Sequence, residues 1–469
     1  MKNTTFKIAL FCIGLSFVVG CKKAVDVTPA AQPEINKWIL ANMQYWYFWT
    51  DKIPTTTDNT LTPDNYFSSL LYKFDATLRP DGDRFSWIQQ SADQLTASLS
   101  GESKTVGADF QLYRKSGSDE LAGRVLYVFP NTPADKAGLK RGDIFAKATI
   151  DGQLLTGTNY SSLLGSGTEW VFTLGTYENA AFVNGTTTKN ITAIVYQEDP
   201  LLKDSVYVRN NTKVGYMVYN QFVPTPNGTS NGQYDSKMDG IIGKFKAAGV
   251  KELIIDLRYN PGGYISSAVN LSSLIGKGIS KSNLMYTSKY NPQATADITK
   301  NQGAGYFNSY FKDKAENIGG QIQRVIILTS SRSASASELV INSLKPYMEV
   351  YLIGDVTVGK NVGSITIKDD TKKIKWGMQP IVLKTFNSAA QSEYTAGFKP
   401  NVSVKESLSQ PLFAFGDLRD PLLNEAFFYI FGSRPARRGI IEEVEADKQK
   451  VFSSIEAKAG GSNMFVEMK

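Results

Sequence analysis

The chain has 469 residues, of which 42% are hydrophobic and 20% are charged; this composition is typical of folded protein, and the length allows about three domains. The net charge of +7 is spread along the chain without a long basic block, which argues against nucleic-acid binding. The chain has no histidine, which excludes Ser-His-Asp and Cys-His catalysis and zinc sites that need imidazole.

The N-terminus predicts an export signal. Lys2 and Lys7 precede an apolar run, residues 8–19, which is short for a membrane span and has the length of a secretory signal. The run ends in Gly20 and Cys21, and this junction resembles the lipobox of bacterial lipoproteins. The resemblance implies cleavage before Cys21 and lipidation of its thiol. A plain signal peptide and a buried apolar helix are the alternatives.

These features predict where the mature protein resides. We expect residues 1–20 to be a lipoprotein signal peptide and residues 21–33 to be a linker behind a lipid anchor at Cys21. No other run is long and apolar enough to cross a bilayer, so we expect a soluble protein tethered in the bacterial cell envelope, in the periplasm or at the outer membrane. Both cysteines, Cys12 and Cys21, lie in this part, so we expect no disulfide in the body of the protein.

Residues 34–102 form an aromatic-rich region. The stretch INKWILANMQYWYFW, residues 35–49, has apolar residues on all sides of a helical wheel and predicts a helix buried on most sides. The stretch PDGDRFSWI, residues 80–88, predicts a turn that enters a short strand. Asp81 and Asp83 could suggest calcium, but the rest of a twelve-residue loop is missing. We therefore expect an N-terminal helical region without a metal site.

Residues 103–200 carry short β-like runs separated by glycine turns, which predicts a small β-domain. Within it, PNTPADKAGLKRGDIF (residues 130–145) predicts a short helix that opens at Thr132 and stops at Gly138. This passage resembles PDZ domains. The resemblance implies a peptide-binding domain that takes peptide ends by adding a strand to a sheet edge.

The PDZ resemblance also implies a carboxylate-binding loop. Its residues would be Gly107, Ala108, Asp109 and Phe110. The pair Ala108-Asp109 departs from the usual Gly-Leu-Gly-Phe type of loop, and Asp109 places a negative charge where a peptide carboxylate is expected.

Strands and helices alternate over residues 205–432, which predicts an α/β core with its site at strand ends. Within this core, residues 277–323 form a long polar segment that we expect to be a lid or an insertion in a substrate groove. Residues 433–469 are charged, and we expect a surface helix or a frayed tail there.

The stretch SRSASASELVI, residues 331–341, joins an apolar strand to an apolar helix. Taken alone, Ser335 with Glu338 three residues later predicts a capping box, in which the serine oxygen accepts an amide of the helix start. A strand-to-helix turn is also where enzymes expose a nucleophilic serine. The local sequence does not separate these two hypotheses.

Two further turns could complete a catalytic site. Residues 260–263, Asn-Pro-Gly-Gly, follow a buried strand, and adjacent glycines let backbone amides approach a substrate as an oxyanion hole requires. Lys360 lies in a Gly-Lys turn between two strand-like runs. Most such lysines are solvated, and a strand-helix turn is the ordinary interpretation of Asn-Pro-Gly-Gly.

Together the three stretches resemble the carboxyl-terminal processing, or tail-specific, serine proteases over about residues 35–432. The resemblance implies an α/β (α+β) protease core of ClpP/crotonase-like type. It also implies a PDZ domain at the position of residues 103–200 and no cofactor. It implies that Ser335 is the nucleophile and that Lys360, 25 residues later, is the general base. A neutral lysine is needed for this, and burial beside residues such as Val358 and Val362 would lower its pKa by about three units.

The resemblance also assigns the supporting groups. It places oxyanion amides at Ala336 and at Gly262 or Gly263. Family members usually have a glutamine four residues after the lysine to orient it; here that position is Ser364, which leaves the third catalytic role open.

We therefore expect a lipid-anchored serine endopeptidase that acts on polypeptides with free C-termini. A homo-oligomer or a complex with an adaptor lipoprotein is left open. The alternative is a catalytically weak or inactive peptide-binding envelope lipoprotein with the same fold, which the Ser364 departure favours. A polysaccharide- or metal-binding surface lipoprotein has only the anchor in its favour.

Overall fold

The structure is a computed structural model that describes residues 30–436, 450–458 and 464–466. The predicted signal peptide, most of the linker and the predicted lipid anchor at Cys21 lie outside these residues. Within the described ranges, no helix combines the length and the apolar character that crossing a bilayer requires.

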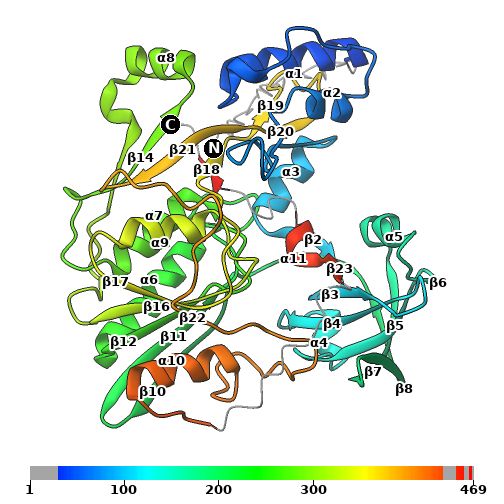
Figure 1. The fold of residues 1–469 in the computed structure, drawn as a ribbon, viewed down its shortest axis with the longest axis vertical. Helices are drawn as coiled ribbons and strands as arrows, with labels where there is room; N and C mark the ends of the chain where they lie inside the picture. The colour runs from blue at the N-terminus through cyan, green and yellow to red at the C-terminus, as the bar shows by residue number, and fades with distance from the viewer. Residues whose placement is uncertain (1–29, 437–449, 459–463, 467–469) are drawn as a thin grey trace, which may run out of the picture.

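A six-stranded sheet, which we call the core sheet, organises the second half of the chain (Figure 1). All neighbouring strands in it are parallel except the β10–β11 pair, which is antiparallel. In spatial order the strands are β10 (Leu201–Arg209), β11 (Thr212–Tyr219), β12 (Glu252–Asp256), β16 (Arg324–Thr329), β17 (Glu349–Gly354) and β22 (Val402–Ser403). The predicted mixed α/β core is confirmed.

Helices cover both faces of the core sheet, as the apolar strands β12 and β16 require. One face packs against α6 (Gln233–Ala248), α7 (Ile265–Ile275) and α9 (Ala336–Leu344). The other face packs against α10 (Pro421–Phe431). The carboxyl ends of β12 and β16 therefore lead directly into the Asn-Pro-Gly-Gly turn and the serine-rich turn at the same edge of the sheet.

A second sheet carries the other half of the site. Its order is β13 (Gly263–Tyr264), β24 (Met464–Phe465), β18 (Val362–Ser364), β21 (Ile381–Asn387), β14 (Leu284–Tyr290) and β15 (Asn308–Tyr310). Strands β14 and β15, with α8 (Pro292–Gln302) and a 3-10 turn (Ala304–Phe307), come from residues 277–323. This segment, expected as a lid or a groove insertion, is thus an edge of the sheet, where β14 pairs with β21.

The N-terminal helical region is present, as predicted, and packs against the second sheet. It contains α1 (Gln32–Trp46), a 3-10 turn (Thr50–Lys52), α2 (Pro63–Ser69), β1 (Trp87–Gln89) and α3 (Ala92–Leu99); β1 joins β20 (Gly377–Gln379) and β19 (Ile367–Lys368) in a small sheet. The prediction that the first helix is buried on most sides is wrong. Only Asn36, Ile39 and Met43 of α1 are buried, because the helix rests on the protein along one face and its tryptophans are half-buried.

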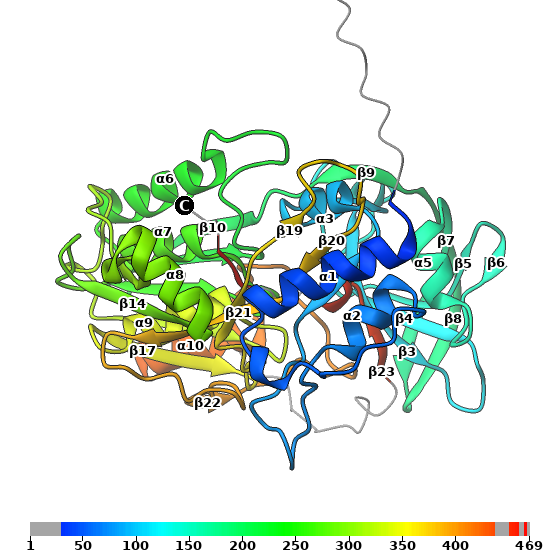
Figure 2. The same cartoon turned by 90° about the horizontal axis from the view of Figure 1, so that it is seen from above.

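Residues 102–197 form the region that we call the β-rich region, on the side of the molecule opposite the core sheet (Figures 1 and 2). Its elements are β2 (Glu102–Thr105), β3 (Ala108–Arg114), β4 (Leu121–Val128), α4 (Pro133–Lys136), β5 (Ile144–Ile150), β6 (Gln153–Leu154), α5 (Tyr160–Ser166), β7 (Glu169–Glu178), β8 (Ala181–Thr192) and β9 (Ile194–Gln197). The predicted short helix opens at Thr132, whose hydroxyl accepts the amide of Asp135, and ends before Gly138 at φ 74°.

The expectation for residues 433–469 is wrong where the structure describes them. Residues 450–458 and 464–466, which together we call the closing segment, contain β23 (Lys450–Ser453), α11 (Ser454–Ala457) and β24. Strand β23 pairs with β3 of the β-rich region, and β24 enters the second sheet. The high charge of the preceding residues hid two short apolar stretches, one around Phe452 and one at Met464 and Phe465.

Candidate active site

The serine-rich turn separates the roles of its three alternating serines. Ser333 donates to the carbonyl of Leu257 (2.7 Å), and Ser337 donates to the carbonyl of Asn260 (3.0 Å). Both therefore fasten this turn to the segment that follows β12, and Ser337 bonds to the Asn-Pro-Gly-Gly turn itself. Ser335 is also fully buried, but its Oγ has no hydrogen-bond partner in the described part of the chain. Of the three hydroxyls, that of Ser335 is the one available for chemistry.

The backbone at Ser335 is unusual for a residue other than glycine. It has φ 63° and ψ −112°, a strained conformation that persists only where the surroundings enforce it. Half of the predicted capping box is present, because the amide of Ser335 donates to Glu338 Oε2 (2.8 Å). The other half is absent, since Ser335 Oγ accepts no helix amide. Helix α9 begins at Ala336, whose amide has no intrahelical acceptor and is a candidate oxyanion donor.

The two glycines of the Asn-Pro-Gly-Gly turn differ in availability. The amide of Gly262 donates to Asn260 Oδ1 (2.9 Å) and is occupied in this conformation. The predicted oxyanion role stays a prediction for both glycines, and the pairing of β13 with β24 involves Gly263. Its φ is 136°, and a Cβ added to it would lie 2.1 Å from the carbonyl oxygen of Phe222. Both observations require glycine at this position.

We expect Gly263→Ala to lower the free energy of unfolding by about 1–3 kcal/mol or more. The added Cβ would collide with the backbone at Phe222, and the positive φ is strained for alanine. Urea denaturation measures this change. Gly240→Ala is the matched control, since a Cβ there meets nothing within 4 Å in the middle of α6; it should stabilise by up to about 1 kcal/mol. Equal stability of the two variants would contradict the steric requirement at Gly263.

Lys360 is fully buried at the end of the turn that precedes β18. Burial holds the pKa of its ammonium well below the usual 10.5, and the nearby carboxylates of Asp83 and Glu338 offset only part of this effect. Its Nζ lies 4.8 Å from the centre of the Phe85 ring, which helps to exclude water. A lowered pKa favours the neutral amine, which is the form of lysine that can accept a proton.

Glu338 joins the nucleophile turn to the lysine turn. Its Oε2 accepts the backbone amides of Ser335 (2.8 Å) and Lys360 (2.7 Å), so the two residues share one acceptor atom. Its Oε1 accepts the Thr357 hydroxyl (2.5 Å) and the Gly359 amide (2.6 Å). Burial raises the pKa of this carboxyl, and the donors that surround it oppose the rise. The sequence suggested only a helix-capping role for Glu338, and the link to the lysine turn was missed.

The N-terminal helical region also contributes to the lysine turn. The guanidinium of Arg84 donates to the carbonyls of Val358 (2.9 Å) and Thr395 (2.9 Å). Arg84 and Phe85 thus hold and cover the turn that carries Lys360. Sequence reasoning missed both residues, because a contact that spans 274 positions leaves no local pattern in one sequence.

The remaining predicted catalytic residue, Ser364, is buried in β18, and its hydroxyl donates to the carbonyl of Met464 (3.2 Å). Its predicted role in orienting Lys360 stays a prediction. No hydrogen bond joins Ser335 Oγ to Lys360 in this conformation. Catalytic hydrogen bonds often form fully only when substrate is bound. The Ser335–Lys360 dyad stays a prediction.

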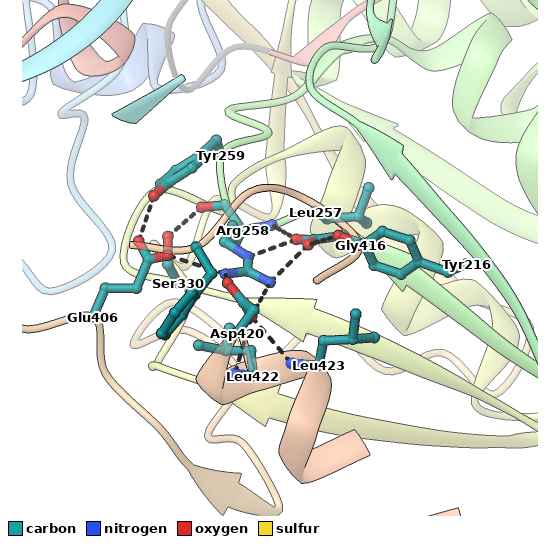
Figure 3. Close-up of polar contacts among 12 residues, drawn as sticks. Tyr216, Leu257, Arg258, Tyr259, Ser330, Glu406, Gly416, Asp420, Leu422 and Leu423 are labelled. Atoms are coloured by element: carbon teal, nitrogen blue, oxygen red, sulfur yellow. Dashed lines mark hydrogen bonds and ion pairs between the residues drawn. The ribbon is translucent and has the colours of Figure 1, made fainter. Parts of the chain in front are cut away.

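A buried ionic network surrounds Arg258, which shortly precedes the Asn-Pro-Gly-Gly turn in the chain (Figure 3). At its centre Arg258, 1% exposed, binds Asp256 (2.8 and 2.9 Å) and Asp420 (2.8 and 2.9 Å). Asp420 also caps α10, and Glu406 accepts from Arg258 (3.0 Å) and from Arg141 of the β-rich region (2.6 Å). Because a buried charge is costly unless paired, the network fixes β12, α10 and the β-rich region relative to one another.

The predicted carboxylate-binding loop, residues 107–110, lies at the start of β3. Gly107 has φ 95°, and a Cβ there would lie 2.2 Å from Thr132. Asp109, the residue that departs from the usual sequence of such loops, has an ionic partner. Its carboxylate pairs with the ammonium of Lys458 (2.7 Å) from the closing segment. The amide of Phe110 is also occupied, by Ser454 Oγ (2.8 Å).

This geometry can support acyl transfer. A buried serine hydroxyl without a partner stands at a helix N-terminus, and a buried lysine of lowered pKa is tied to the same carboxylate. The backbone amide of Ala336, the first residue of α9, directly follows the serine as a candidate oxyanion donor. No bound cofactor is needed for such chemistry.

Comparison with known protein families and proteins identifies similarity to serine proteases. The model of Peptidase family S41 matches residues 213–404, and the model of the Peptidase S41 N-terminal domain matches residues 34–87. A protein of Staphylococcus epidermidis described as a CtpA-like serine protease is 25% identical over 334 residues, which cover 70% of this chain and 58% of that protein. This chain therefore aligns with less than two thirds of that relative's length.

Two further matches cover a larger share of the proteins with which this chain is compared. The carboxy-terminal processing protease CtpA of Bacillus subtilis is 24% identical over 408 residues, 85% of this chain and 74% of that protein. The crystal structure of a candidate S41 protease from Bacteroides fragilis has a TM-score of 0.67 and 26% identity, and the match covers 84% of this chain and 97% of the other.

Proposed function

The chain belongs to peptidase family S41, and from that premise we propose that it is a serine endopeptidase that cleaves polypeptides with a Ser335–Lys360 dyad through an acyl-enzyme. The observation that carries the proposal is the pair formed by Ser335 and Lys360. Both are fully buried, and both donate their backbone amide to Glu338 Oε2.

The proposed reaction begins with attack by Ser335 Oγ on a peptide carbonyl carbon, while neutral Lys360 takes the hydroxyl proton. The carbonyl oxygen becomes negative and is stabilised by the amides of Ala336 and Gly263. Collapse breaks the C–N bond, and the leaving amine takes the proton from Lys360. Water then attacks the ester at Ser335, with Lys360 again as base, and frees the new carboxyl terminus.

The proposed substrates are polypeptides recognised through their C-terminal parts. The support is the similarity to the carboxy-terminal processing protease of Bacillus subtilis and strand β3, which takes an added strand, β23, along its edge in a region that resembles PDZ domains. We also propose that the protein is anchored in the bacterial cell envelope through a lipid on Cys21, on the evidence of the apolar run and the Gly20-Cys21 junction in the sequence.

A second candidate function is peptide binding without efficient cleavage. Two observations favour it: Ser335 Oγ makes no hydrogen bond to Lys360, and Ser364 directs its hydroxyl to Met464. A protein of this kind would keep the peptide-binding surfaces and lack an activated nucleophile.

Labelling with a fluorescent alkyl fluorophosphonate separates the two candidates without knowledge of a natural substrate. In a serine hydrolase, Ser335 Oγ attacks phosphorus, fluoride leaves, and Lys360 accepts the proton. We expect one label per chain, found by mass spectrometry on the peptide that contains Ser335. Ser331→Ala, at an exposed serine of the same turn, should label as well as the parent chain. Absence of label on Ser335 would favour the binding protein.

The pH dependence of labelling tests the base. The rate should rise with pH through the pKa of Lys360, because only the neutral amine accepts the proton. Burial lowers this pKa well below 10.5, so the rate should already reach its plateau below about pH 10. A rate that begins to rise only near pH 10 would contradict a buried, neutral Lys360.

A further inference from the structure

The closing segment of the chain enters the proposed active site as a β-strand. Strand β24 lies between β13 and β18, parallel to both, with Met464 opposite Gly263 and Phe465 opposite Tyr264 and Ser364. Thus one neighbour of β24 carries the candidate oxyanion glycine, and the other follows the candidate base. The contact to β18 includes the bonds from Ser364 Oγ to the Met464 carbonyl (3.2 Å) and from the Val466 amide to the Ser364 carbonyl (3.0 Å).

The side chains of β24 are held as firmly as its backbone. Met464 is 0% exposed and belongs to the same apolar cluster as Ala336 of the nucleophile turn. Phe465 is 3% exposed, and its ring centre lies 5.5 Å from that of Tyr264. It also packs in a small cluster with residues of α3. The groove between β13 and β18 therefore has specific places for two large apolar side chains.

A second part of the closing segment occupies the β-rich region. Strand β23 adds to the edge of β3 in antiparallel register, with Phe452 opposite Leu112 and Ser453 opposite Gln111. The Phe452 ring lies between β3 and α5, with ring centres 6.3 Å from Phe110 and 5.7 Å from Tyr160. This is the geometry of peptide recognition by strand addition at a sheet edge.

The same surface binds a cation of the closing segment. Lys458 Nζ lies between the carboxylates of Asp109 (2.7 Å) and Glu198 (2.6 Å), two side chains that are at most 7% exposed. Without Lys458, these two carboxylates would face each other in a buried site with no cation between them, which is unfavourable. The loop that sequence similarity suggested for a carboxylate is thus built here to accept an ammonium group.

We propose that the closing segment is an intramolecular peptide ligand that fills both the edge of β3 and the groove beside Ser335, and that substrate polypeptides must displace it to be cleaved. The inference rests on the proposed peptidase function and adds to it the identity of the resident ligand. It also defines the class of polypeptide that fits. Such a polypeptide is an extended strand with a basic residue that pairs with Asp109 and two consecutive large apolar residues that fit between β13 and β18.

Competition by a tethered segment has a kinetic signature. Because the segment is part of the chain, it competes with substrate at an effective concentration on the order of millimolar. A substitution that weakens binding of the segment to its grooves therefore raises the apparent affinity of the enzyme for any substrate. We expect Phe465→Asp and Lys458→Met each to lower KM for casein by about tenfold and to leave kcat within about twofold. A variant that merely destabilised the fold would lower kcat instead.

Two exposed substitutions serve as matched controls. Val208→Asp adds a charge at a side chain that is 67% exposed in β10, and Lys281→Met removes a charge from a side chain that is 78% exposed. Both should leave KM unchanged. If Phe465→Asp and Lys458→Met also leave KM unchanged while cleavage still depends on Ser335, the inference is overturned and the proposed function stands.

A binding measurement decides the case in which no variant cleaves, an outcome that would defeat the proposed function. A labelled peptide with the sequence of residues 450–469 is titrated into full-length Ser335→Ala and into the same chain with Phe465→Asp and Lys458→Met added. We expect the second protein to bind at least about tenfold more tightly, because its own segment no longer fills the groove. Equal affinity for both proteins would overturn the inference whatever the cleavage assay gives.

Discussion

Cleavage of unfolded casein is expected to fall by at least about 10⁴-fold when Ser335 is replaced by alanine and by about 10³-fold when Lys360 is replaced by methionine. The first change removes the oxygen that forms the acyl-enzyme. The second keeps the approximate length of the buried side chain and the backbone amide that donates to Glu338 Oε2, but removes the buried amine that is proposed as the general base. Product formation from residues 22–469, followed by gel and mass spectrometry, measures both effects.

Two comparisons sharpen this test. Lys360→Arg should be as inactive as Lys360→Met, because a guanidinium stays protonated and cannot act as a base. Ser331→Ala should retain activity, since its side chain is exposed in the same turn. Equal cleavage by the parent chain, Ser335→Ala and Lys360→Met would eliminate the dyad.

The second large effect is expected for Glu338→Gln. The carboxylate accepts four hydrogen bonds, two on each oxygen, and an amide can accept at only one of these atoms. Two buried donors would then lose their acceptor, which costs about 2–5 kcal/mol of stability. We expect casein cleavage to fall by about 10²-fold, because the nucleophile turn and the lysine turn are no longer held by one group.

A pH profile distinguishes positioning by Glu338 from a purely structural role. The negative charge of Glu338 raises the pKa of Lys360, opposing the effect of burial. Its removal should therefore move the onset of fluorophosphonate labelling to lower pH, even while the plateau rate falls. Glu178→Gln, at an exposed position of β7, is the control and should change neither stability nor the profile. An unchanged onset in Glu338→Gln would reduce Glu338 to a fold-stabilising residue.

The sequence predicted those parts of the site that consist of short, contiguous motifs. The serine-rich turn, the Asn-Pro-Gly-Gly turn and the Gly-Lys turn are each short, and the alternation of strands and helices implied that they meet at one edge of a sheet. The structure places the first two directly after the neighbouring parallel strands β16 and β12. The hydrogen bonds of Ser333 and Ser337 give these two serines a structural role and leave Ser335 as the candidate nucleophile.

The parts that escaped prediction depend on contacts between distant segments. Arg84 reaches the carbonyl of Val358, and Lys458 reaches Asp109 across more than half of the chain. One sequence carries no signal for such pairs. The closing segment was misread because charge dominates its composition, whereas its structure is set by a few apolar residues such as Phe465 that find places in preformed grooves.

The position of β24 also limits what can reach Ser335. Strands β13 and β18 are separated by one strand, which corresponds to two spacings of about 4.8 Å, so the groove admits a single extended chain. A helix or a hairpin does not fit and must first open. The free energy of that local opening is then added to the apparent binding free energy of every substrate. We therefore expect discrimination by the local stability of the target, with frayed or unfolded polypeptides consumed and well-folded neighbours spared.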